Sequence, residues 1–165
     1  MLAGALLVAM LGFVWAIHDQ FEQRIVDVGD RAPSFSVTTE SGRRISSSEF
    51  GGRLLVLNFW ATWCPPCVEE MPSLDDFARQ MTKDGVVVLG VSIDKNEGAY
   101  KQFLKQASVS FEVTRDPQAD IPTDYGTFKW PETYVIDRNG RVVQKMVGPK
   151  TWTDPKIVNS IRAFL

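Results

Sequence analysis

Both cysteines of this 165-residue chain lie in one short stretch, 58–72, which reads NFWATWCPPCVEEMP. Cys64 and Cys67 are separated only by Pro65 and Pro66. A pair at this spacing can bind a metal ion, pack in a core or exchange disulfides with another molecule. In the last case Cys64 attacks a disulfide of the partner, and Cys67 attacks the resulting mixed disulfide to release the product. This chemistry needs no cofactor beyond a redox-active Cys64–Cys67 disulfide.

The metal-binding alternatives differ in the number of ligands that they need. A structural zinc ion takes four ligands, and the cysteine pair supplies only half of them. The sole histidine, His18, lies near the start of the chain, so we expect no zinc site within the chain. Copper(I) can bind to two soft thiolates, and a copper(I)-binding and delivery module therefore remains the alternative function. Met71 lies nearby, but methionine at helical spacing is more typical of a core than of a ligand.

Two apolar runs flank the cysteine pair and predict strands. Residues 54–61 and 86–93 are nearly continuous in apolar side chains, as in strands covered on both faces. Between them, over 67–81, apolar residues recur every three or four positions and predict a helix that Gly85 ends. Pro72 lies inside this helix and removes a backbone hydrogen bond, so we expect a kink there. The order strand, helix, strand indicates a right-handed βαβ unit.

The βαβ unit places the cysteine pair at the N-terminus of the helix. Cys64 follows the first strand and Cys67 begins the helix, where the partial positive charge of the helix end favours a thiolate. We expect Cys64 to be exposed and readily ionised, with Cys67 close behind it. Pro65 and Pro66 suit the first helical turn, because its amide protons have no partner within the helix.

The rest of the pattern extends this unit into an α/β domain. In chain order we expect a hairpin around Ser41 and Gly42, a helix over 97–107, a strand over 109–113, a hairpin over 133–147 and a final helix after Asp154. A hydrophobic content of 44% is enough for one core. The formal net charge of −2 leaves no basic stripe, so we expect no nucleic-acid partner.

The start of the chain has a different composition. Residues 1–17 carry no charged side chain, and as a helix they would be roughly 26 Å long, close to the thickness of the hydrocarbon core of a bilayer. We expect a membrane anchor here, with a cleaved signal peptide and a buried helix as alternatives. The segment lacks the basic residues that would fix its orientation. The chain then divides into an anchor or signal segment (1–17), a tether (18–28) and a domain (29–165).

From Gly29 to Gly148 the sequence resembles the thioredoxin-like proteins of the TlpA, ResA and CcmG group. The likeness rests on the motifs APSF, FWATWCPPC and WPETYVID, on Pro72 and on an insertion over 94–107. It implies an α/β thioredoxin fold with an N-terminal β-hairpin and a central βα insertion, preceded here by the hydrophobic segment. It also implies a catalytic domain in the periplasm, held at the inner membrane by a single N-terminal anchor.

The resemblance implies a thiol–disulfide oxidoreductase that reduces disulfides in partner proteins, with apocytochrome c as one candidate substrate. Electrons would come from a membrane reductant, because no flavin or nicotinamide fingerprint is present. A peroxidase of the same fold is a weaker option, because Thr62 stands too close to Cys64 for the Thr-x-x-Cys arrangement that such enzymes use.

The resemblance also assigns a role to Glu70. Asn58 stands where ordinary thioredoxins have a buried aspartate, whereas the membrane-tethered relatives carry a glutamate three residues after the second cysteine. Glu70 matches that position, on the same helix face as Cys67, and would shuttle the proton of Cys67. The alternative is that Glu70 is a solvated surface charge, as we expect for Glu69.

Pro131 matches the cis-proline of the family, which faces the cysteine pair and exposes the backbone of the preceding residue to an extended substrate. That residue, Trp130, is larger than is usual in the group. It would narrow the substrate groove or stack on a partner, and the alternative is packing against the rim of the active site. Trp63 is expected half exposed beside Cys64, whereas Trp60 is expected in the core. The predicted substrate surface therefore consists of Trp63, Pro65, Pro66, Trp130 and Pro131.

Overall fold

The computed structural model describes residues 10, 12, 13 and 25–165. Of the expected anchor, 1–17, the structure describes only residues 10, 12 and 13, and of the expected tether, 18–28, only residues 25–28. The remaining parts of both segments lie outside the described residues. Within the described part of the chain, no helix has the length and apolar character needed to cross a bilayer. The domain expected over 29–165 is described throughout.

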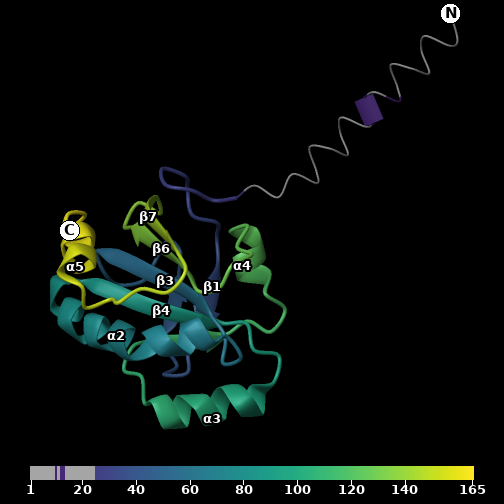
Figure 1. Ribbon diagram of the computed structural model, residues 1–165. Helices are drawn as coiled ribbons and strands as arrows, with labels where there is room; N and C mark the ends of the chain where they lie inside the picture. Colours follow the sequence, from purple (N-terminus) through teal and green to yellow (C-terminus); the bar gives the residue numbers. More distant parts are fainter. Residues whose placement is uncertain (1–9, 11, 14–24) are drawn as a thin grey trace, which may run out of the picture.

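A mixed five-stranded sheet in the order β5-β4-β3-β6-β7 forms the centre of the domain (Figure 1). Every residue of the central strand, β3 (Leu54–Trp60), is buried, as its apolar run predicts. β3 pairs in parallel with β4 (Val86–Ser92), and β4 with β5 (Glu112–Arg115). On its other side β3 pairs antiparallel with β6 (Glu132–Asp137), which pairs antiparallel with β7 (Val142–Val147). The βαβ unit and the second hairpin are therefore confirmed.

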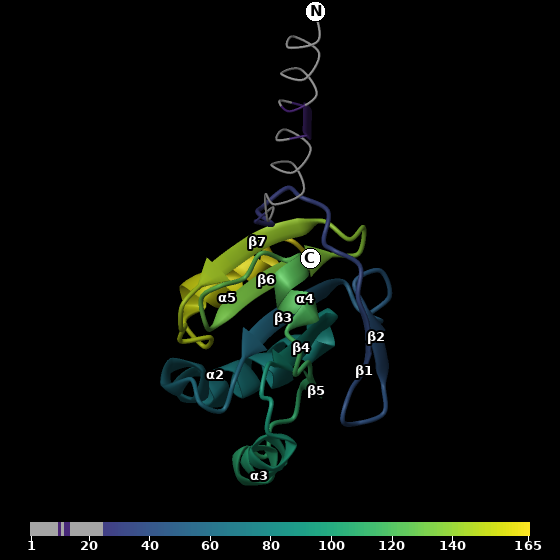
Figure 2. The same ribbon diagram turned by 90° about the vertical axis from the view of Figure 1, so that its right-hand side faces the viewer.

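Both faces of the sheet are covered. α2 (Pro65–Met81), α3 (Glu97–Ala107) and α5 (Pro155–Arg162) supply apolar side chains to the core on one face. The other face packs against the chain before β1, against the loops around the hairpin β1-β2 and against Tyr125, which ends α4 (Asp120–Asp124). Figure 2 shows α2 and the hairpin on opposite sides of the sheet. This hairpin, β1 (Ser36–Thr38) and β2 (Arg44–Ser46), is a separate two-stranded sheet.

Local signals account for where the helices begin and end. α2 runs unbroken through Pro72 and is followed by a short 3₁₀ turn, η1 (Thr82–Asp84), which Gly85 ends with a left-handed φ of 86°. Asn96 caps α3 by accepting a hydrogen bond from Ala99 N at 3.0 Å. Asp154 caps α5 in the same way through Lys156 N, as its position before Pro155 predicts.

Two elements differ from the expectation. The strand expected over 109–113 lies at Glu112–Arg115 instead. Ser108 ends α3 in a left-handed conformation, and the backbone N–H and hydroxyl of Ser110 both donate to Asp75 of α2, at 2.6 and 2.7 Å. These bonds hold the first residues of the expected strand against α2 and away from the sheet. α4 is the other difference, because a helix of five residues is too short to show a periodic pattern.

The described chain packs on the domain upstream of the boundary expected at Gly29. Val26 is buried, its N–H donates to Tyr125 O at 3.1 Å, and its carbonyl accepts from Lys145 Nζ at 2.9 Å. Lys145 also forms an ion pair with the buried Glu132, at 3.1 Å. The segment that enters the domain is therefore hydrogen-bonded to β7 and to the residue that ends α4.

Gly90 of β4 offers a test of the packing behind the active site. A Cβ atom at Gly90 would lie 3.0 Å from Trp60 Nε1, 3.1 Å from Phe111 Cε2 and 3.4 Å from Val113 Cγ1. Because these neighbours are enclosed in the core, Gly90→Ala is expected to lower the free energy of unfolding by about 1–3 kcal/mol. Urea denaturation of both proteins measures the difference. An unchanged midpoint would show that Trp60 and Phe111 can move aside at no cost.

Candidate active site

Cys64 and Cys67 form a disulfide at the start of α2, with their Cα atoms 5.3 Å apart. This separation lies within the ordinary range for a disulfide, so the backbone already allows the two sulfurs to bond. Cys64 occupies the N-cap of α2 with an extended backbone, and its carbonyl accepts from Cys67 N and Val68 N. The strand β3 and the first turn of α2 thus position the pair as the sequence predicts.

The exposure of Cys64 differs from the expectation. Its residue is only 5% exposed in this disulfide form, and Cys67 is fully buried. The disulfide joins Cys64 to the first turn of α2. The side chain of Cys64 also belongs to the core cluster on the face of the sheet that α2 covers. Trp63, 59% exposed, and Pro65 present the solvent-facing surface at this end of the helix. Cys64 is the one member of the pair with any accessible surface, so an incoming thiolate reaches it first.

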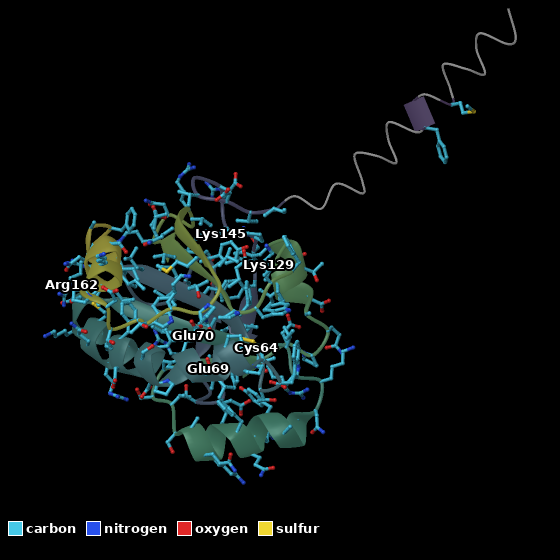
Figure 3. The ribbon with its side chains drawn as sticks, in the orientation of Figure 1. Cys64, Glu69, Glu70, Lys129, Lys145 and Arg162 are labelled. Carbon is cyan, nitrogen blue, oxygen red and sulfur yellow. A yellow bond between two sulfur atoms is a disulfide. The ribbon has the colours of Figure 1, made fainter. Side chains whose placement is uncertain are left out.

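Glu70 lies in the interior, one turn of α2 after Cys67, and is only 4% exposed. Its Oε1 accepts from Asn58 Nδ2 at 2.9 Å, and its Oε2 accepts from Lys150 N at 2.8 Å. The alternative that Glu70 is a solvated surface charge is therefore wrong, whereas Glu69 is exposed as expected. Figure 3 shows Cys64, Glu69 and Glu70 at the same end of α2.

The surroundings of Glu70 favour a carboxyl that can take up a proton. Burial raises the pKa of Glu70 above its ordinary value of 4.5, and the hydrogen bonds from Lys150 and Asn58 offset part of this rise. The indole of Trp152 also lowers the pKa of Glu70, while its buried Nε1 has no hydrogen-bond partner among the described residues. A buried carboxyl with a raised pKa can accept a proton from a nearby group and return it.

Asn58 connects Glu70 to the sheet. It is fully buried in β3, and its Nδ2 donates both to Glu70 and, at 2.9 Å, to Thr133 Oγ1 of β6. Ser73 connects α2 to the loop after β7 in a similar way, because its hydroxyl accepts from Trp152 N at 3.2 Å. No sequence pattern indicates that Lys150 and Trp152 lie near Glu70 or that Thr133 bonds to Asn58, because these residues are far apart in the chain.

The peptide bond between Trp130 and Pro131 is cis, as the resemblance implies. The register of the sheet pairs Phe59 with Glu132, so Pro131 lies beside the end of β3 that leads to Cys64. Trp130 is half-buried and packs edge-on against the ring of Phe59, with the centroids 6.5 Å apart. The structure therefore favours the packing role for Trp130.

Other aromatic and polar groups complete the site. Trp60 is fully buried and Trp63 is exposed, as predicted. Beside the cis bond, Glu132 Oε1 accepts from Tyr134 Oη at 3.1 Å and pairs with Lys145, a buried arrangement that the sequence did not indicate. In the part of the chain that the structure describes, no group of three or more histidine, cysteine or acidic side chains could hold a metal ion.

The fold and the site together define a class of protein. A mixed sheet, a Cys-Pro-Pro-Cys disulfide at the head of the helix that follows its central strand, and a cis-proline beside that strand are the parts of a thioredoxin-like thiol–disulfide oxidoreductase.

Comparison with known proteins agrees with this class. The chain belongs to the AhpC/TSA family, whose sequence model matches residues 28–145. It is 35% identical over 126 residues to thiol-disulfide oxidoreductase ResA of Bacillus thuringiensis subsp. konkukian, with 76% of this chain and 73% of ResA covered. It is 33% identical over 156 residues to the thioredoxin-like protein YneN of Bacillus subtilis, with 91% of each chain covered.

A solved structure gives the same result. A crystal structure described as that of a thiol:disulfide interchange protein, DsbE, of Chlorobium tepidum matches with a TM-score of 0.72 and 31% identity. The match covers 84% of this chain and 95% of that chain. These relatives confirm the resemblance to the TlpA, ResA and CcmG group and the thioredoxin-like fold.

Proposed function

We propose that the protein works outside the cytoplasm, anchored to the inner membrane, and reduces disulfides in partner proteins through Cys64 and Cys67. The observation that carries this proposal is the Cys64–Cys67 disulfide, with the buried side chain of Glu70 one helical turn after the buried Cys67. The uncharged segment 1–17 supports the membrane location. Apocytochrome c is one candidate substrate among the proteins of that compartment.

The reaction runs in two exchange steps. The Cys64 thiolate attacks a substrate disulfide, forming a mixed disulfide and releasing one substrate thiolate. Cys67 then loses its proton to Glu70 and attacks Cys64, which releases the second substrate thiolate and leaves the Cys64–Cys67 disulfide. The substrate has gained two electrons, and a membrane dithiol reductant must supply two electrons to restore the cysteines.

The substrate segment is proposed to lie extended beside the cis bond. The backbone of Trp130 would pair with it, and Trp63, Pro65, Pro66 and Pro131 would form the surface around Cys64. The exposed indole of Trp63 supports this arrangement, because an aromatic surface next to the attacking sulfur of Cys64 can hold an extended chain of varied sequence. Trp130, packed on Phe59, would fix the shape of the groove.

Reduction of insulin by dithiothreitol provides the first test. The wild-type protein is expected to accelerate it, and Cys64→Ala is expected to abolish the acceleration, because it removes the attacking sulfur. Copper(I) titration tests the alternative function in the same preparation. Tight one-to-one copper binding together with negligible insulin reduction would reverse the proposal in favour of a copper-delivery module.

A further inference from the structure

Three buried polar side chains form a continuous chain of hydrogen bonds behind the cysteine pair. Glu70 lies on α2, Asn58 on β3 and Thr133 on β6, and each is at most 4% exposed. Asn58 is the middle member, with one amide hydrogen on Glu70 Oε1 and the other on Thr133 Oγ1, both at 2.9 Å. The proton acceptor proposed for Cys67 is thus tied to the strand that begins directly after Pro131.

The orientation of the Asn58 amide follows from the charge of its neighbour. An ionised carboxylate can only accept hydrogen bonds, so the amide must present its nitrogen to Glu70. This orientation leaves the other end of the amide unsatisfied. Asn58 Oδ1 is buried and has no hydrogen-bond partner among the described residues. Buried amide oxygens are usually satisfied, so the arrangement serves the carboxylate at the expense of the amide itself.

We propose that Asn58 is a positioning residue for the proton transfer between Cys67 and Glu70. Its amide holds the carboxylate in place and supports its charge, and Thr133 holds the amide. This inference rests on the proposed function, because it takes Glu70 as the group that accepts the Cys67 proton. Asn58 itself does not touch the substrate or exchange a proton.

The identity of residue 58 matters because its side chain donates directly to the Glu70 carboxylate. The charged group that acts on Glu70 is Lys150 in the loop after β7, whose backbone N–H and ammonium charge both stabilise the carboxylate, and Cys67 precedes Glu70 by one turn on the same helix. An aspartate at position 58 would remove a donor and add a second carboxylate within hydrogen-bond distance. Two carboxylates so close cannot both ionise readily, and they titrate as a coupled pair.

Asn58→Asp is therefore the direct test, in the full-length protein with both cysteines present. The reduced protein is mixed rapidly, across a range of pH, with a small disulfide whose two thiol products absorb light differently from the disulfide. The first thiol appears on attack by Cys64 and the second on release by Cys67, so the two steps are measured separately. The midpoint of the release step is expected to move up by about one pH unit or more, which is about tenfold slower release at pH values well below the wild-type midpoint. Attack by Cys64 is expected to change much less.

A second variant and a control keep the test decisive. Thr133→Val keeps the size of the side chain and removes only the anchor of the amide, so its release midpoint should move in the same direction by a smaller amount. Asn159→Asp adds the same charge on the exposed face of α5 and should leave both steps unchanged. A release midpoint in folded Asn58→Asp equal to that of the wild type would overturn the proposal, as would an equal slowing of both steps. Failure of the wild type to form the mixed disulfide would instead overturn the proposed function.

Discussion

Cys67→Ala is expected to convert the protein into a trap that stays covalently joined to its substrate. Cys64 keeps its place at the N-cap of α2 and can still attack, but the sulfur that would release the product is gone. Turnover is expected to fall by roughly three orders of magnitude or more, as for other catalytic groups that act as a unit. The mixed disulfide should accumulate as a one-to-one adduct.

The trap identifies the partner as well as testing the mechanism. Membranes from the native host expressing Cys67→Ala are solubilised with free thiols blocked, and adducts are separated without reductant and identified by mass spectrometry. Cys64→Ala is the matched control, because it keeps the buried Cys67 and loses the accessible sulfur, so it should give no adduct. Recovery of equal adducts from both variants would show that Cys64 is not the nucleophile.

The parts of the site that are local in sequence could be predicted, because they depend on neighbouring residues. β3 and α2 follow from apolar runs of different period, and together they place Cys64 and Cys67 at a helix N-terminus. The cis bond before Pro131 and the special position of Glu70 came from the resemblance, since no periodicity indicates either.

The environment of Glu70 could not be predicted in the same way. Its hydrogen bonds depend on Asn58, twelve residues before it, and on Lys150, eighty residues after it, while Thr133 lies seventy-five residues from Asn58. These residues meet because β6 pairs with β3 and the loop after β7 returns to α2. The order of strands in a sheet cannot be predicted from the sequence of any one segment. The wrong expectation for Cys64 has the same origin, because its burial depends on how the disulfide and the adjoining core pack around it.

Glu70→Gln is expected to slow release of the reduced substrate by about a hundredfold, the lower end of the range for losing a positioned proton acceptor. Glutamine keeps the size of the side chain but cannot accept the Cys67 proton, so release should also lose its dependence on pH in the range where Glu70 titrates. The measurement is the same separation of attack and release by rapid mixing. Glu69→Gln is the matched control, because it makes the same change at the adjacent, exposed position. Equal rates of release in the two variants would remove Glu70 from the mechanism.

The same pair of variants tests the buried carboxyl without any substrate. Because burial raises the pKa of Glu70 above 4.5, the folded protein binds its proton more tightly than the unfolded chain does. The resulting stabilisation is fully present below pH 4.5 and is lost as the pH rises through the folded-state pKa, with a slope of at most about 1.4 kcal/mol per pH unit. Urea denaturation of the disulfide form at a series of pH values should therefore show the stability of the wild type falling relative to Glu70→Gln across this window. The difference between wild type and Glu69→Gln should show no comparable fall, and a flat difference for Glu70→Gln would mean that its carboxyl titrates as an exposed one does.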